Sequence, residues 1–221
     1  MNRRIMHAAL GATAAVAASG LVLSLSSSPA SAETIEISLH DAVDQLEVAA
    51  EEPDGYDRDK FPHWVADDRD GCNARYEVLI AEAVEPPTVG DGCELSGGKW
   101  FSYFDAVELT DTSDVSIDHF VPLAEAWRSG ARDWSTEDRQ RFANDLGDER
   151  TLVGVTISSN SSKGDSDPSD WMPDNEQCRY LTEWAVTKTR WRLPADEDEK
   201  SFLTSAVAEC PNDTLTIEYA M

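Results

Sequence analysis

The sequence is short of basic residues. Its 221 residues include 18 lysines and arginines against 43 aspartates and glutamates, a formal net charge of −25 at pH 7. This balance argues against an extended basic groove for long nucleic acid, and it suits a secreted protein kept soluble by self-repulsion. The chain also lacks the Gly-x-Ser-x-Gly and His-Glu-x-x-His patterns. Serine-hydrolase and zinc-peptidase mechanisms therefore have no support in the sequence.

Long apolar runs are absent after the N-terminus. Arg3 and Arg4 precede an alanine-rich stretch from about residue 8 to 25, and small residues follow up to Ala32. This order is typical of a secretory signal peptide in residues 1–32, cleaved after Ala32. A membrane anchor is the alternative, but a stretch so rich in Ala, Gly and Ser spans a bilayer poorly. Cleavage removes two arginines and no acid, so the net charge becomes −27. We expect an extracellular protein without a membrane partner.

Cysteine is scarce, and no Cys-x-x-Cys pair occurs. The four cysteines are Cys72, Cys93, Cys178 and Cys210, all beyond the predicted cleavage point. The missing Cys-x-x-Cys spacing disfavours a zinc site. An even count in an exported chain predicts two disulfides, for which three pairings are possible. We favour Cys72–Cys93 and Cys178–Cys210, because sequence neighbours form an early and a late pair.

The chain contains no internal repeats, and its pattern predicts a single domain after the signal peptide. Apolar periodicity and capping residues predict helices over residues 38–51, 122–128, 135–146, 175–192 and 196–210, strands over 115–121 and 151–156, and a hairpin within 93–109. Residues 33–37 are predicted to be a frayed or edge segment, and 73–84 to be helix or strand. The polar, aromatic segment 56–71 is predicted to be a loop. Its Asp67, Asp68 and Asp70 do not match a calcium-loop spacing.

Two short segments carry the residue types of a hydrolytic site. Asp118 and His119 end the predicted strand, and Asn160, Lys163 and Asp165 follow the next strand in a polar turn that enters a short helix. Carboxylate and amide oxygens can bind a hard divalent cation, and an imidazole beside them can deprotonate water. These residue types suit phosphodiester hydrolysis.

The two segments and the text around them resemble the HNH endonuclease superfamily. The resemblance extends over about residues 56 to 210. The residues around the two segments make it more specific, because they resemble the secreted actinobacterial branch of this superfamily. The matching text is Asp118-His119-x-Val121-Pro122-Leu123, Leu152-Val153, Asn160-x-x-Lys163-Gly164-Asp165, Ala124-Glu125-Ala126-Trp127-x-Ser129-Gly130-Ala131, Phe142-Ala143-Asn144-Asp145-Leu146, Asp167-Pro168-x-x-Trp171-x-Pro173, Cys178-x-Tyr180 and Lys188.

The resemblance implies an α+β fold. A ββα-metal core (HNH, or His-Me finger) would be embedded in a mainly helical single domain with two disulfides. The expected organisation is a signal peptide in residues 1–32, an N-terminal helix and linker in 33–55, and the HNH endonuclease domain in 56–221.

The resemblance also implies roles for individual residues. Asp118 and Asn160 would hold one Mg²⁺ or Mn²⁺ ion, His119 would be the general base that activates water, and Lys163 would neutralise a phosphate oxygen. We expect Trp171 to stack on a base and Arg75 to reach a phosphate. Core packing and a surface ion pair are the respective alternatives.

The sequence departs from the commonest motif at two places. Asn160 stands where many members have a second histidine, which favours magnesium or manganese over zinc. No asparagine occurs near residues 148–151, where the motif has its middle Asn, so Asn144 serves in its place or the role is absent. Among the other histidines, we expect His40 on the surface and His63 in a packing or hydrogen-bonding role.

The sequence therefore predicts a secreted, divalent-metal-dependent endonuclease that hydrolyses phosphodiester bonds with low sequence specificity. DNA is the expected substrate, with RNA left open, and the expected state is a monomer. The alternative is a secreted acidic binding or scaffold protein with a degenerate nuclease fold. A secreted toxin is less favoured, because the sequence has no recognisable delivery module.

Overall fold

The computed structural model describes residues 33–66 and 71–221, which form a mixed α/β fold within one compact unit. Its helices are α1 (Leu39–Gln45), η1 (Arg58–Lys60), α2 (Ala74–Ala81), η2 (Asp91–Cys93), α3 (Leu123–Arg128), η3 (Ala131–Asp133), α4 (Thr136–Ala143), α5 (Ile157–Lys163), α6 (Gln177–Arg190) and α7 (Glu197–Val207). Its strands are β1 (Thr34–Ser38), β2 (Thr88–Val89), β3 (Leu95–Ser96), β4 (Trp100–Ser102), β5 (Val107–Leu109), β6 (Val115–His119), β7 (Leu152–Thr156) and β8 (Thr214–Glu218). The predicted signal peptide and Asp67, Asp68 and Asp70 lie outside the described residues.

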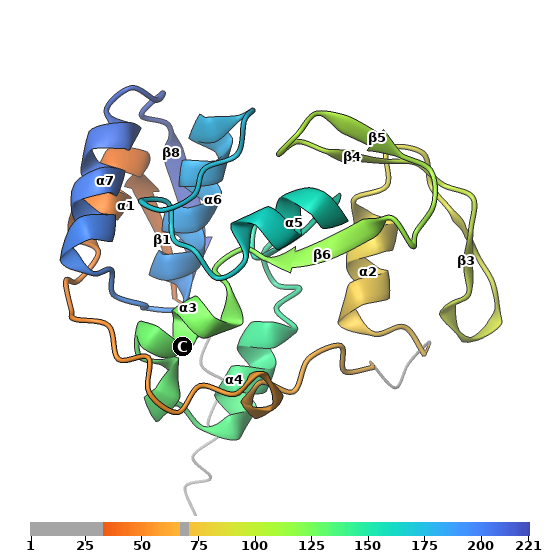
Figure 1. Ribbon diagram of the computed structural model, residues 1–221, viewed down its shortest axis with the longest axis horizontal. Helices are drawn as coiled ribbons and strands as arrows, with labels where there is room; N and C mark the ends of the chain where they lie inside the picture. The colour runs from red at the N-terminus through yellow and green to blue at the C-terminus, as the bar shows by residue number, and fades with distance from the viewer. Residues whose placement is uncertain (1–32, 67–70) are drawn as a thin grey trace, which may run out of the picture. The chain divides into compact units, whose positions relative to one another are not determined.

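A strand pair and one short helix form the part of the fold that carries both motif segments. Strands β6 and β7 pair antiparallel, with Asp118 opposite Val153 and His119 opposite Leu152. The chain passes directly from β7 into α5, whose first turn is capped by the Thr156 side chain. Figure 1 shows α5 lying along β6. The predicted order of strand, strand and short helix is confirmed.

Most other elements lie where the sequence predicts them, with shorter ends. The side chains of Ser38 and Ser135 cap α1 and α4, as expected for the Ser-x-x-Asp pattern at each position. The segment 73–84, predicted as helix or strand, contains helix α2. Strands β4 and β5 form the predicted hairpin.

The two ends of the described chain meet in a pairing that the sequence did not predict. Residues 33–37, predicted as a frayed or edge segment, contribute to β1, which pairs with β8 at the opposite end of the chain. This pair packs with α1, α6 and α7 around a large core that includes Trp184, Trp191 and Leu203. A second, smaller core lies on the other side of β6 and includes Trp100 and Ile117.

A buried lysine joins three helices beneath the larger core. Lys188 of α6 is fully buried, and its ammonium lies 2.7 Å from Glu125 of α3 and 2.9 Å from Glu199 of α7. It also donates to Ser129 Oγ and the Pro194 carbonyl. Buried ions remain in a protein interior when partners satisfy them in this way. The cluster fixes α3, which follows the motif, against α6 and α7.

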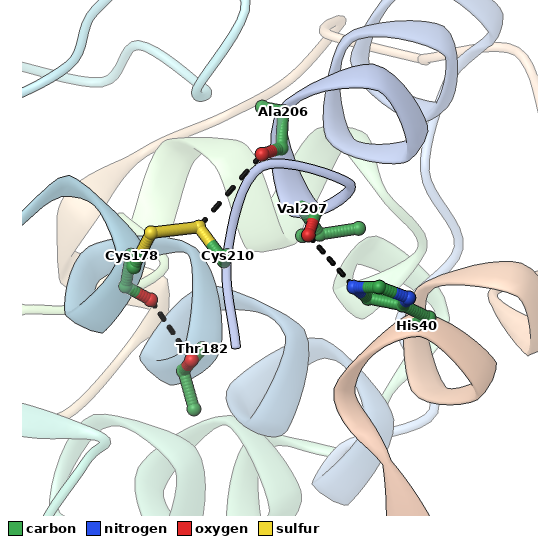
Figure 2. Close-up of a disulfide and its surroundings, with 6 residues drawn as sticks. All are labelled: His40, Cys178, Thr182, Ala206, Val207 and Cys210. Carbon is green, nitrogen blue, oxygen red and sulfur yellow. Dashed lines mark hydrogen bonds between the residues drawn. A yellow bond between two sulfur atoms is a disulfide. The ribbon is translucent and has the colours of Figure 1, made fainter. Parts of the chain in front are cut away.

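The structure contains both predicted disulfides, Cys72–Cys93 and Cys178–Cys210. The second joins the start of α6 to the end of α7, and Figure 2 shows His40 of α1 beside it. The His40 ring donates through Nε2 to the Val207 carbonyl at 2.8 Å. His40 is only partly buried, so it lies at the surface as expected, and its ring also connects α1 to α7.

Among the described residues, no helix combines the length and apolar character that crossing a bilayer requires.

Candidate functional site

The side chains at the end of β6 point to two different environments. Alternate residues of a strand face opposite sides, so Ser116 and Asp118 share one face and His119 lies on the other. Ser116 Oγ accepts a hydrogen bond from Asn160 at 2.7 Å, and Asp118 contacts Lys163. Both partners come from α5. The helix therefore meets β6 through two polar contacts on one strand face.

Lys163 is enclosed by the strand end that it contacts. Its ammonium is fully buried, forms an ion pair with Asp118, and donates to the Phe120 carbonyl at 2.7 Å and the His119 carbonyl at 3.3 Å. Burial lowers the pKa of Lys163 and raises the pKa of Asp118, while the attraction between the two charges opposes both shifts. Lys163 therefore faces the protein interior, where a substrate phosphate does not reach it.

Asp118 and Asn160 each retain one free oxygen. Asp118 is 4% exposed, and its Oδ1 makes no hydrogen bond with a described residue. Asn160 uses its amide nitrogen on Ser116, which leaves the amide oxygen unpaired among the described residues. A carboxylate and an amide oxygen are donors that Mg²⁺ and Mn²⁺ accept, with water and phosphate completing the shell. The donor set fits such an ion.

The His119 ring is held by a carbonyl on one side and an indole on another. Its Nε2 lies 2.9 Å from the Ala143 carbonyl, and Trp64 stacks on the ring with centroids 5.0 Å apart. A carbonyl can only accept, so the proton of the neutral ring sits on Nε2 and the lone pair on Nδ1. Burial, and then the charges of Arg58 and His63, lower the pKa of His119 to about 3. The ring is neutral at physiological pH.

Asn144 fixes the loop that lies against His119. Its side chain accepts from the Val65 backbone N–H at 2.9 Å and donates to the Pro62 and Gln140 carbonyls at 2.8 and 2.7 Å. Asn144 therefore orients this loop, and it does so from a different place in the chain than the missing middle asparagine of the motif. Where that asparagine was expected, the Thr151 carbonyl accepts from the Phe120 backbone N–H at 2.9 Å.

An open hollow of about 390 Å³ lies against the α5 side of the site. Its lining residues come from the segment that enters η1 and its first residue, from β6, from the start of α3, and from α5 and the turn after it: Tyr56, Arg58, Ser116, Pro122, Leu123, Ala124, Asn160, Ser161, Gly164 and Asp165. Asn160 therefore borders a space that can admit a ligand. Tyr56 and Arg58 were not predicted to be site residues, because they lie in a segment predicted to be a loop.

The two remaining predicted site residues, Arg75 and Trp171, contact other parts of the fold. The Arg75 guanidinium donates to the Thr112 and Val115 carbonyls at 3.0 and 3.1 Å, just before and at the start of β6. Trp171 is half-buried against Phe104 and donates to Ser162 Oγ at 3.1 Å. Contact of either residue with a substrate stays a prediction.

His63 shares the surroundings of His119. Its Nδ1 bonds to the Phe61 carbonyl at 2.8 Å, which agrees with the expected hydrogen-bonding role. Its ring centroid lies 6.3 Å from that of His119.

A separate group of acids is occupied by structural contacts. Ligand oxygens of Glu51, Asp167 and Asp196 lie within 4.8 Å of one another. Glu51 pairs with Arg128 at 3.0 Å, Asp167 accepts from the Ser169 N–H at 2.6 Å, and Asp196 caps α7. Burial, with the nearby Glu125 carboxylate, raises the pKa of Glu51 to about 7. These contacts account for the grouping.

Comparison with known proteins gives a family and one relative. Residues 93–206 match the family described as "GmrSD restriction endonucleases, C-terminal domain". The chain is 43% identical over 159 residues to an "Uncharacterized secreted protein" of the fungus Arthroderma benhamiae, covering 71% of this chain and 76% of the relative. That relative is fungal, whereas the sequence resemblance was to an actinobacterial branch. No solved structure matches the chain.

Proposed function

Because the chain belongs to the family of GmrSD restriction endonuclease C-terminal domains, we propose that it is a secreted endonuclease that hydrolyses phosphodiester bonds with one Mg²⁺ or Mn²⁺ ion. The matched segment, residues 93–206, contains β6, β7 and α5 and so every residue of the motif. We propose DNA as the substrate, RNA as a second substrate, and an HNH-type arrangement of the site.

The observation that carries this proposal is the orientation of His119. Donation from Nε2 to the Ala143 carbonyl leaves Nδ1 as the nitrogen that carries the lone pair. A neutral imidazole in a fixed tautomer can take a proton from a water molecule as that water attacks phosphorus. The carbonyl stabilises the imidazolium that results, because both of its nitrogens are then donors.

In this proposal, Asp118 and Asn160 hold the ion through their free oxygens. When bound, the ion supplies Lewis-acid stabilisation of the charge that develops on the phosphate and on the leaving oxygen. Lys163 takes a different role from the one expected of it. Its buried contacts with Asp118 and with the carbonyls after it keep the carboxylate in one orientation. We assign Lys163 to positioning, away from the substrate.

Secretion is supported by two independent features. Both disulfides of the described chain are of the kind that persists in oxidising, extracellular surroundings. The fungal relative carries the word "secreted" in its printed name.

The test is a cleavage assay with the chain from residue 33 onwards, produced in oxidising conditions. Supercoiled plasmid and total RNA are incubated with MgCl₂, MnCl₂, ZnCl₂ or EDTA over a range of salt concentrations. The proposal expects nicked and linear plasmid with magnesium or manganese, inhibition by EDTA, and slower cleavage as salt rises. Intact plasmid and RNA in every metal would count against it.

A second candidate is an acidic secreted binding protein without activity. It is favoured by the net charge of −25 and by the Asp118–Lys163 ion pair, which occupies one of the two carboxylate oxygens. Calorimetric titration with MnCl₂ separates the two candidates. The nuclease proposal expects binding that is lost in Asp118→Ala, and the binding-protein candidate expects no heat that depends on Asp118.

A further inference from the structure

We propose that Arg58 binds a backbone phosphate of the polynucleotide in the hollow beside Asn160. This inference rests on the proposed function and names the cation that the site offers to its substrate. A strongly acidic chain that cleaves a polyanion needs a fixed positive charge at the place of binding. Lys163 was expected to supply that charge, but it is buried against Asp118.

Arg58 is the one lysine or arginine among the described residues that line the hollow. It is exposed and makes no ion pair with a described residue, whereas most other arginines of the described chain are paired with acids. A guanidinium presents several N–H donors in one plane, which matches the oxygens of a phosphate. Its charge is therefore available to an anion.

The acids nearest to the hollow are engaged elsewhere. Asp165 also lines it, but the Asp165 carboxylate pairs with Arg128 at 2.9 Å, and its backbone carbonyl accepts from the same guanidinium at 2.7 Å. Asp57, next to Arg58, caps η1 by accepting from the Asp59 N–H at 3.0 Å. Neither acid forms an ion pair with Arg58.

The segment that carries Arg58 is fixed before any substrate binds. The Phe61 ring is fully buried at the end of η1, and Lys60 donates to the Gly55 carbonyl at 2.6 Å. Arg139 donates to the Lys60 carbonyl at 3.0 Å. A side chain on such an anchored turn loses less entropy on binding than one on a free loop.

Tyr56 lines the same hollow as Arg58. The half-buried Tyr56 ring packs edge-on against Trp127, with centroids 6.3 Å apart. Its hydroxyl can donate to a phosphate oxygen that the guanidinium binds.

The experiment measures binding and cleavage separately with Arg58→Ala, Arg58→Lys and Tyr56→Phe. Arg192→Ala is the control, because Arg192 is an exposed arginine that packs over Tyr219 at 4.0 Å and is not among the residues that line the hollow. Binding of a short fluorescein-labelled oligonucleotide is followed by anisotropy, in EDTA and in CaCl₂, over a range of KCl concentrations. Cleavage kinetics in MgCl₂ give kcat and KM for each variant, and thermal melting checks folding.

Arg58→Ala is expected to raise the dissociation constant and KM about ten- to a hundredfold, as for loss of a charge-assisted hydrogen bond, and to reduce the salt slope by about 1. Arg58→Lys should keep the salt slope and recover part of the affinity, Tyr56→Phe should weaken binding less, and Arg192→Ala should match the wild type. Unchanged binding, KM and salt slope in a folded Arg58→Ala would overturn the proposal.

The outcomes for the wild type separate this inference from the proposed function. A wild type that cleaves with the same KM as Arg58→Ala contradicts the phosphate site alone. A wild type that binds through Arg58 without cleaving in any metal contradicts the nuclease alone. A wild type that neither binds nor cleaves contradicts both.

Discussion

The indole of Trp64 lies against the imidazole of His119, with ring centroids 5.0 Å apart and planes inclined by 29°. Trp64 holds this place with a φ of 56°, a left-handed conformation that is rare for a bulky aromatic residue. The loop around it is fastened by Asn144 through Val65 and Pro62. The orientation of the proposed general base thus depends on a loop far from it in the sequence.

Asn144→Ala should lower catalysis more than it lowers stability. It removes the two hydrogen bonds that hold the Trp64 loop, to the Val65 N–H and the Pro62 carbonyl, and a small displacement of a catalytic group can cost up to about a hundredfold in rate. We expect kcat to fall about tenfold or more and oligonucleotide binding in CaCl₂ to stay unchanged. Cleavage kinetics and anisotropy measure the two effects. Wild-type kcat in a folded Asn144→Ala would show that the loop does not orient His119.

Lys163→Met should destabilise the protein strongly. The substitution leaves the Asp118 carboxylate buried without its cation, which typically costs about 3–5 kcal/mol of unfolding free energy. Urea unfolding followed by tryptophan fluorescence measures this cost. Asp118→Asn combined with Lys163→Met removes both charges and should recover part of the stability. A Lys163→Met variant as stable as the wild type would mean that the pair does not hold α5 on β6.

Glu82→Gln should change how stability depends on pH. Glu82 lies at the end of α2 and accepts from the Gly154 N–H of β7, and burial raises its pKa from 4.5 to about 7. The folded state therefore favours the neutral acid. The neutral Glu82 side chain makes its full contribution to the free energy of unfolding below pH 4.5. That contribution is lost as the pH rises through 7.

Glutamine keeps the acceptor and has no charge to bury. Glu82→Gln should match the wild type near pH 4.5 and exceed it at pH 8 by up to about 3 kcal/mol. Urea unfolding of both proteins across this pH range measures the difference. Parallel stability curves for the two proteins would contradict the raised pKa.

Replacing Cys178 and Cys210 with alanine should lower the stability of the helical core. The disulfide joins α6 to α7 across a sequence separation of 32, and closing a loop of this size is worth about 3–4 kcal/mol. Denaturant unfolding measures the loss. The packing of α1 through His40 and Val207 should persist in the folded variant. A change of less than about 1 kcal/mol would mean that helix packing alone holds this corner.

Local signals in the sequence predict the elements that carry the motif. The structure has the predicted strand that ends in Asp118-His119 and the predicted helix cap at Ser135. Both features depend only on residues close together in the sequence. The pairing of β1 with β8 joins the two ends of the described part of the chain, and no local pattern specifies it. The same holds for the acceptor of His119, which is a backbone carbonyl 24 residues away and independent of which side chain stands at that position.

The position of the Lys163 side chain could not be predicted from its residue type alone. Asp118 and Lys163 are 45 residues apart in sequence, and their side chains meet only because α5 lies along the Asp118 face of β6. Sequence reasoning placed the lysine toward a substrate, since a cation beside a motif is normally exposed. The exposed cation beside the hollow is Arg58, which lies in the segment 56–71 that was predicted to be a loop.

The central claim is that His119 is the general base of a metal-dependent endonuclease. The most direct measurement is the single-turnover cleavage rate of supercoiled plasmid in MgCl₂ by wild type and His119→Ala. His40→Ala is the control, because His40 bonds to the Val207 carbonyl of α7 and lies outside the motif. The account predicts a loss of about 10²–10⁴-fold in His119→Ala, with manganese binding by calorimetry preserved and His40→Ala still active. Equal cleavage rates in wild type and His119→Ala would contradict it.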